Sequence, residues 1–214
     1  MPFLFRILRV PFVLGLLLLA PTAGSSTPAP TLLVLGDSIS AAYGMSLEQG
    51  WVALLERRLA EKYPGSSVIN ASISGETSAG GLRRLPALLS EHRPSLVVIE
   101  LGGNDGLRGY PINKFRDNLR EMANLSREAG AQVLFLAMEI PPNYGTRYTT
   151  AFRESFSVVA EETESTLGPF LLDGVAAVPG MMQPDGIHPT VSAQQRLMDN
   201  VLPTLDEMLS PPGP

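Results

Sequence analysis

The sequence predicts an α/β fold in which one parallel β-sheet is covered by helices on both faces. Two features of the 214 residues support this prediction: short apolar runs recur along the chain, and segments with helical periodicity separate them. Strands that alternate with helices are typical of a parallel sheet joined by right-handed crossovers. The chain is long enough for one well-buried domain, and its apolar share of 44% is ordinary for a globular protein.

Five short runs are predicted to be strands. Apolar runs of this length, bounded by turn residues, are typical of strands buried on both faces. The three strong runs end close to Gly36, Gly102 and Pro141. The strong predictions cover residues 31–35, 95–101 and 131–138, and the weaker ones cover 67–70 and 170–173.

Five segments with apolar residues at helical spacing are predicted to be helices. The first ends before Pro64 and the third ends near Gly130, because proline and glycine commonly terminate helices. The predicted helices cover residues 51–63, 77–89, 115–130, 149–167 and 190–209. The domain is therefore predicted over residues 31–209, and the proline-rich tail at 210–214 is expected to fray.

The first 25 residues are predicted to be a secretory signal peptide outside that domain. Arg6 and Arg9 precede an apolar stretch at 12–20, and small residues follow it; this order is typical of a cleaved export signal. The apolar stretch is about half of the roughly 20 residues that a bilayer span needs, so a retained membrane anchor is the weaker alternative. We expect cleavage after Ala23 or Ser25, a periplasmic or secreted protein, and no stable membrane span after cleavage.

Charge and residue usage argue against several other kinds of function. The formal net charge is −5 and no basic tract is present, so nucleic acid is not an expected partner. The chain has no cysteine, which excludes disulfides, thiolate metal sites and a cysteine nucleophile. With only two histidines, a histidine-rich metal site is not expected. We expect no metal, no cofactor and, by default, a monomer.

The carboxyl ends of the predicted strands carry the residues of chemical interest. In open parallel sheets, ligands bind beyond these ends. Small and polar residues follow the strands at 36–38, 70–75, 102–105 and 140–145. Because these ends share one edge of the sheet, that edge is the predicted active face.

A serine nucleophile and its base can be assembled from two distant segments. His188 lies in the loop before the last predicted helix, and histidine is the usual general base at neutral pH. Asp185 can orient one ring nitrogen while the other faces Ser38. We expect a helix to start at Ser38 and to add free N–H groups and positive dipole character there. Taken alone, Ser38 is better explained as a helix N-cap, whereas Asp185 and His188 fit a turn residue and a surface residue as well as they fit a catalytic pair.

Acyl transfer at a serine also needs hydrogen-bond donors for the oxyanion of the tetrahedral intermediate. The candidates are the backbone N–H groups of Ser38 and Gly75 and the side-chain amide of Asn104. Each of the last two can equally be a turn residue. Their joint occurrence at successive strand ends, with Ser38 first and His188 last, favours a serine hydrolase.

Four short blocks of the sequence resemble the SGNH superfamily of GDSL-type hydrolases. They are GDSIS at 36–40, NASISGET at 70–77, GGND at 102–105 and DGIHP at 185–189. The stretches at 101–109 and 142–145 are most similar to the bacterial thioesterase I, lysophospholipase and arylesterase group. The one departure in the first block is Ile39, where the family name has leucine.

The resemblance implies a flavodoxin-like, three-layer α/β/α sandwich with about five parallel strands. It implies Ser38 as nucleophile, His188 as base and Asp185 as its orienter, with oxyanion donors at Ser38, Gly75 and Asn104. It also implies a small-molecule acyl ester or thioester as substrate, such as an aryl ester, an acyl thioester or a lysophospholipid, in the periplasm.

Two other functions fit the same residues. A carbohydrate O-acetyl esterase would use them on a shorter acyl group, and a non-catalytic module could hold an anion with the strand-end loops and helix N-termini. The substrate-binding residues remain unknown. Residues 141–145 and 176–183, the latter with Met181 and Met182, could wall an acyl groove, but core packing explains them equally well.

Overall fold

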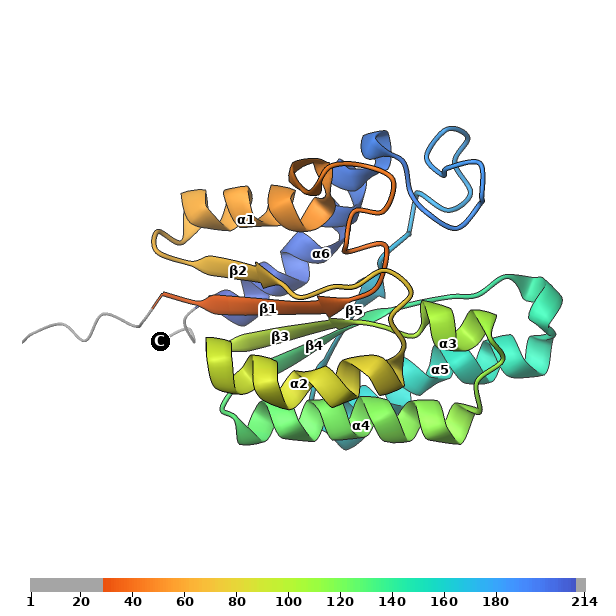
Figure 1. Ribbon diagram of the computed structural model, residues 1–214, viewed down its shortest axis with the longest axis horizontal. Helices are drawn as coiled ribbons and strands as arrows, with labels where there is room; N and C mark the ends of the chain where they lie inside the picture. The colour runs from red at the N-terminus through yellow and green to blue at the C-terminus, as the bar shows by residue number, and fades with distance from the viewer. Residues whose placement is uncertain (1–28, 211–214) are drawn as a thin grey trace, which may run out of the picture.

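The computed structural model describes residues 29–210 and has a five-stranded parallel sheet at its centre (Figure 1). The strand order is β2-β1-β3-β4-β5, which is the flavodoxin-like order. The predicted α/β sandwich with about five parallel strands is confirmed. The predicted signal peptide and all of the predicted tail except Ser210 lie outside the described residues. The strands are β1 (Thr31–Gly36), β2 (Ser67–Asn70), β3 (Leu96–Glu100), β4 (Gln132–Ala137) and β5 (Thr166–Phe170).

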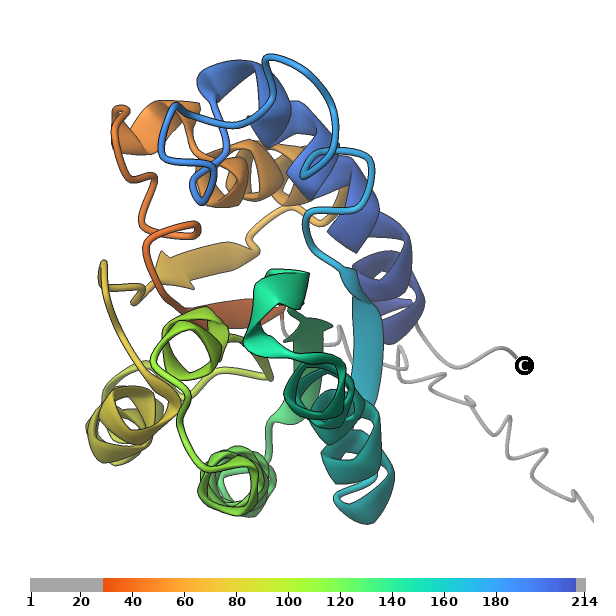
Figure 2. The ribbon, with the colours of Figure 1, turned by 90° about the vertical axis from the view of Figure 1, so that its right-hand side faces the viewer.

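Helices cover both faces of the sheet. One layer holds α1 and α6, which pack against each other, and the other holds α2, α4 and α5, with α4 in contact with both neighbours (Figure 2). The helices are α1 (Trp51–Lys62), α2 (Ser78–His92), α3 (Gly103–Leu107), α4 (Ile112–Glu128), α5 (Thr146–Glu162) and α6 (Gln194–Leu209). Three 3₁₀ turns, η1 (Leu47–Gln49), η2 (Pro142–Tyr144) and η3 (Val191–Ala193), complete the connections.

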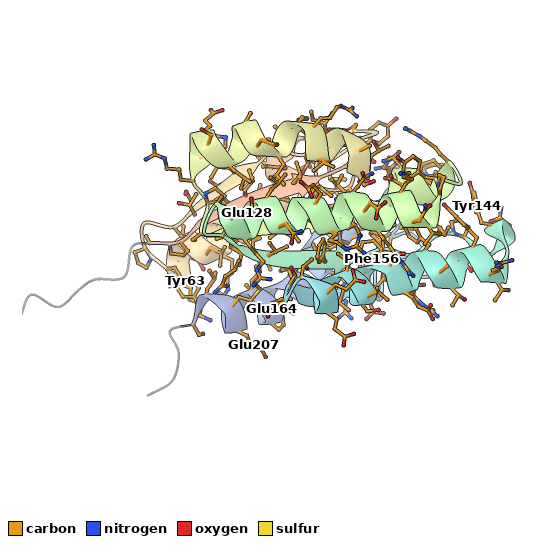
Figure 3. All side chains as sticks on the ribbon, turned by 90° about the horizontal axis from the view of Figure 1, so that it is seen from below. Tyr63, Glu128, Tyr144, Phe156, Glu164 and Glu207 are labelled. Carbon is orange, nitrogen blue, oxygen red and sulfur yellow. The ribbon has the colours of Figure 1, made fainter. Side chains whose placement is uncertain are left out.

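The middle of the sheet is buried on both faces, which explains why its strands read as continuous apolar runs. Leu33, Val98 and Leu134 have no exposed surface. Below the sheet, α4 and α5 bring together Phe115, Phe152 and Phe156, with ring centroids 5.1 to 5.6 Å apart. Figure 3 views this layer from below, with Glu128 and Glu164 near one end and Tyr144 at the other. The strand arrows, and so the carboxyl ends of the strands, point toward the side of the molecule that holds α3 (Figure 1).

The fourth predicted helix and the fifth predicted strand are displaced in the structure. The helix ends at Glu162 instead of residue 167, and the strand covers 166–170 instead of 170–173. The helix ends because Glu164 adopts a left-handed φ of 49°, and the Thr163 hydroxyl bonds to the Val159 carbonyl in the last turn. Gly168 and Pro169 interrupt the edge strand, so its apolar signal is weaker than that of the buried residues that follow it.

Within residues 29–210, none of the helices combines the length and the apolar character that a bilayer span requires.

Candidate active site

Three side chains from the two ends of the domain meet in a continuous line of hydrogen bonds. The Ser38 hydroxyl lies 2.9 Å from His188 Nε2, although the two residues are 150 positions apart in the sequence. On the other side of the ring, His188 Nδ1 lies 2.7 Å from Asp185 Oδ2. The parallel sheet produces this meeting, because the β1 turn and the loop before η3 both lie beyond the carboxyl ends of the strands. Such a line can move a proton from the hydroxyl to the imidazole.

Ser38 lies in a turn and not at the start of a helix. The turn spans residues 38–44 and is closed by the Ala41 N–H, which donates to the Asp37 carbonyl at 2.9 Å, and by the Tyr43 N–H, which donates to the Ser38 carbonyl at 3.0 Å. The first α-helix begins only at Trp51. The prediction that a helix starts at Ser38 and contributes its dipole there is therefore wrong. The backbone N–H groups near Ser38 belong to a turn instead.

The loop of His188 is shaped by the Asp185 carboxylate. Asp185 Oδ1 accepts the backbone N–H groups of Ile187 at 2.9 Å and of His188 at 3.0 Å. The bond from the His188 ring, followed by these two backbone bonds, lowers the pKa of Asp185 to about 2. An ionised carboxylate can only accept hydrogen bonds, so the ring proton resides on Nδ1 and Nε2 is left free to accept from Ser38.

Gln183 ties the two loops together. Its side-chain nitrogen donates to the Tyr43 carbonyl at 2.9 Å and to the Pro189 carbonyl at 3.0 Å, and its backbone N–H donates to the His188 carbonyl at 2.7 Å. The Tyr43 ring also lies against the His188 ring, with centroids 4.2 Å apart. The sequence alone did not predict these contacts, because nothing in the sequence around a loop glutamine indicates a hydrogen-bond partner 140 residues away.

The structure leaves all three expected oxyanion donors with unused hydrogen-bonding capacity. Within residues 29–210, the N–H groups of Ser38 and Gly75 donate to no other residue. Gly75 lies in an exposed turn between β2 and α2 with φ of 78° and open space around its Cα. Asn104 lies in α3, directly after β3, and one hydrogen of its amide is directed to Asp37 Oδ2 at 3.2 Å. Its second amide hydrogen has no acceptor among these residues.

Two buried aspartates hold these donors in place, and the sequence reasoning gave neither a role. Asp37 Oδ1 accepts the Ile39 N–H at 3.0 Å while Oδ2 orients Asn104. Burial raises the pKa of Asp37 to about 6, against the opposing effects of the Ile39 bond and of His188.

Asp105, next to Asn104, accepts both the backbone N–H of Ser78 at 2.8 Å and its hydroxyl at 2.6 Å. Ser78 begins α2, three residues after Gly75. This contact therefore fixes the Gly75 loop relative to Asn104. Burial raises the pKa of Asp105.

A cleft of about 440 Å³ opens beside Ser38, Asn104 and His188. Its walls are mainly apolar, and they include Leu107, Met138, Ile140, Phe170, Leu172 and Met182. Of the two segments for which a groove wall and core packing were equal explanations, Pro141, Pro142, Ala176 and Met182 line this cleft. A space of this kind next to a nucleophile can receive an apolar acyl group. Among residues 29–210, no three His, Asp or Glu side chains are grouped as metal ligands would be.

Comparisons with known proteins agree with this geometry. Residues 34–196 match the GDSL-like Lipase/Acylhydrolase family. Esterase TesA from Pseudomonas aeruginosa is 55% identical over 204 residues, which cover 95% of this chain and 100% of that protein. The thioesterase 1/protease 1/lysophospholipase L1 of Escherichia coli (strain K12) is 46% identical over 171 residues, covering 80% of this chain and 81% of that protein. The crystal structure of the psychrotrophic esterase EstA from Pseudoalteromonas sp. is similar, with a TM-score of 0.81 and 44% identity over 84% of this chain and 98% of that chain. The chain therefore belongs to the GDSL-like lipase/acylhydrolase family.

Proposed function

We propose that this protein is a serine hydrolase that cleaves carboxylic esters and thioesters through an acyl-enzyme intermediate. The observation that carries the proposal is the line from Ser38 through His188 to Asp185, with bonds of 2.9 and 2.7 Å, at the mouth of an apolar cleft. A non-catalytic anion-binding module would have no need of a histidine placed between a hydroxyl and a carboxylate.

In the first half of the reaction, Ser38 Oγ attacks the acyl carbon and its proton passes to His188 Nε2. Asp185 stabilises the imidazolium that forms, because its carboxylate is ionised and already bonded to Nδ1. The negative charge that develops on the carbonyl oxygen is met by the Ser38 and Gly75 N–H groups and by the Asn104 amide. The leaving alcohol or thiol takes the proton from His188, and Ser38 keeps the acyl group.

In the second half, water attacks the acyl carbon and gives a proton to His188. The same donors stabilise the second oxyanion. When the tetrahedral intermediate collapses, the fatty or aryl acid leaves and Ser38 recovers its proton from His188. The route is complete with the side chains of this chain and water.

The substrate class follows from the cleft and from the relatives. Apolar walls favour an acyl chain of several carbons over an acetyl group. The related proteins are called an esterase and a thioesterase/lysophospholipase. We therefore propose aryl esters, acyl thioesters and lysophospholipids as substrates, and keep a carbohydrate O-acetyl esterase as the alternative.

A substrate panel tests this proposal. Purified protein should hydrolyse p-nitrophenyl esters and acyl thioesters, with kcat/KM rising from acetyl to medium-chain acyl groups. Ser38→Ala should lose turnover while keeping its melting temperature, and Ser157→Ala, a matched serine on the exposed face of α5, should behave as wild type. Faster turnover of acetylated sugars than of any longer ester would favour the alternative, and full activity in Ser38→Ala would refute the proposal.

We also propose that residues 1–25 direct export and that the mature enzyme works in the periplasm or outside the cell. The order of basic, apolar and small residues supports this. N-terminal sequencing of the protein from a periplasmic extract should give a start after Ala23 or Ser25. An intact Met1 in a cytoplasmic fraction would contradict it.

A further inference from the structure

A fully buried carboxyl group lies directly beneath the nucleophile turn. Glu100 is the last residue of β3 and has no exposed surface. Its Oε2 atom accepts the Ser40 hydroxyl at 2.7 Å and the Asp37 N–H at 3.3 Å. Both donors belong to the segment that carries Ser38, one on each side of it. The mechanism described above assigns Glu100 no role.

The contacts of Glu100 extend to the helix that follows the turn. The Ser40 hydroxyl, which donates to Glu100, accepts the indole N–H of Trp51 at 3.2 Å. The Ser40 carbonyl accepts the side-chain amide of Asn70, at the end of β2, at 2.8 Å. Glu100 of β3 and Trp51 of α1 therefore meet at the Ser40 hydroxyl, and Asn70 of β2 bonds to the carbonyl of the same residue, two positions after the nucleophile.

The fit between the turn and Glu100 is close. A Cβ atom at Gly36 would lie 2.7 Å from Glu100 Oε2 and 2.7 Å from Ser40 Cβ, which is shorter than two non-bonded atoms can approach. Glycine at position 36 is thus what lets the carboxyl reach the turn. The arrangement is specific to this site and is not general core packing.

The environment of Glu100 favours a neutral carboxyl group. Oε1 is buried and has no hydrogen-bond partner among the described residues, and an ionised oxygen in that position would be costly. Burial, and then the nearby Asp37 charge, raise the pKa of Glu100 well above its usual range. A neutral acid still accepts hydrogen bonds through its other oxygen.

We propose that Glu100 is a positioning residue for Ser38: as an uncharged acceptor it fixes the turn from Asp37 to Ser40, and so the distance between the Ser38 hydroxyl and the His188 ring. The proposal rests on the proposed function, because it concerns the placement of the same nucleophile. Loss of this acceptor leaves the Asp37 N–H and the Ser40 hydroxyl buried without their partner, so the turn shifts to find another. A shift of about 1 Å at a reacting atom can lower the rate by about 100-fold.

The test compares three variants by kcat, KM and unfolding free energy. Glu100→Ala should lower kcat about 10- to 100-fold while KM changes by less than about threefold. Glu100→Gln, which is uncharged and keeps an acceptor oxygen, should retain kcat within about threefold of wild type. Val98→Ala, on the same strand and equally buried, is the stability control, because its side chain is not bonded to the turn.

Three results would overturn the proposal. The first is wild-type kcat in Glu100→Ala, and the second is a loss in Glu100→Gln as large as that in Glu100→Ala. The third is a loss of kcat in Val98→Ala that equals the loss in Glu100→Ala when the two variants have the same unfolding free energy. That result would mean that reduced stability alone explains the loss of activity. If Glu100→Ala does not fold, Ser40→Ala takes its place and should lower kcat by about tenfold with KM unchanged; wild-type kcat there would equally refute it. If the wild-type protein hydrolyses no ester, the proposed function itself has failed.

Discussion

Replacing Asp185 with asparagine should remove most of the activity while changing the shape of the site very little. Asp185 Oδ1 accepts two backbone N–H groups, at 2.9 and 3.0 Å. An asparagine must keep its oxygen at those donors, so its NH₂ group takes the place of Oδ2, 2.7 Å from His188 Nδ1. That NH₂ group donates, so Nδ1 has to accept. The ring proton then moves to Nε2, which can no longer take the proton of Ser38.

The size of the effect follows from the loss of the correct tautomer. In a serine–histidine–aspartate arrangement this loss lowers kcat by about 10⁴-fold, which corresponds to about 5.5 kcal/mol in the activation free energy. Asp185→Ala should be no worse than Asp185→Asn in kcat, because without the NH₂ group the ring is free to take either tautomer. The alanine variant should be less stable, since the two backbone donors lose their acceptor.

Steady-state hydrolysis of a p-nitrophenyl ester at neutral pH measures the effect, with thermal unfolding as the check on folding. Asp173→Asn is the matched control, because Asp173 is exposed in the same long loop and its one ion-pair partner among residues 29–210, Arg196, is 3.9 Å away. It should behave as wild type. An Asp185→Asn enzyme within about tenfold of wild type would refute the reasoning, since tenfold is only about 1.4 kcal/mol.

Three further predictions concern single features of the structure. Asn104→Ala should lower kcat by about 10²- to 10³-fold with little change in KM, because one oxyanion donor is lost. The value of kcat/KM should fall on acidification, because the base has to be unprotonated to accept the Ser38 proton, and because protonation of Asp37, whose pKa is about 6, weakens the acceptor that orients Asn104. Gly102→Ala should lower the unfolding free energy by about 2–4 kcal/mol, because position 102 has φ of 127° and its Cβ would lie 2.7 Å from Phe115 Cζ.

Each of these has a clear contrary result. Near-wild-type kcat in Asn104→Ala would remove that amide from the oxyanion site, and a rate that is flat down to about pH 4 would remove His188 as the base. An unchanged melting temperature in Gly102→Ala would mean that the backbone at that position relaxes without cost.

The buried Asp37 also has a consequence for stability that can be separated from activity. Its pKa is 3.8 in an unfolded chain and about 6 in the folded protein. The folded state therefore holds more protons between these values, so the unfolding free energy falls as pH rises from about 4 to about 6, by about 3 kcal/mol for this group alone. Asp37→Asn should abolish that part of the pH dependence in denaturant titrations. An unchanged slope would contradict the raised pKa.

Much of the fold was predictable because the sheet is parallel and buried on both faces. In such a sheet the sequence of each central strand is a continuous apolar run. The bounds of β1, β3 and β4 therefore agree with the predicted bounds to within one or two residues. The edge strand β5 was misplaced because Gly168 and Pro169 interrupt it, while the apolar residues after it are buried in loop structure. The short helix α3 was missed because GNDGL has no amphipathic pattern.

The meeting of Ser38, His188 and Asp185 was predictable from the order of strands, since parallel strand ends share one edge. The turn at Ser38 was not, because contacts with Glu100 and Trp51, distant in the sequence, add to the bonds among its own residues. The same limit applies to Gln183, Asp105 and Glu100. Each has a partner between 27 and 140 residues away, and a single sequence carries no record of such contacts.

The central claim is that Ser38 is a nucleophile activated by His188. Incubation with a fluorophosphonate, followed by intact-protein mass spectrometry and peptide mapping, tests it most directly. The claim predicts one adduct per chain on the peptide that contains Ser38, no adduct in Ser38→Ala, and much slower labelling in His188→Ala. Labelling at another residue, or none in a protein that turns over esters, would contradict it.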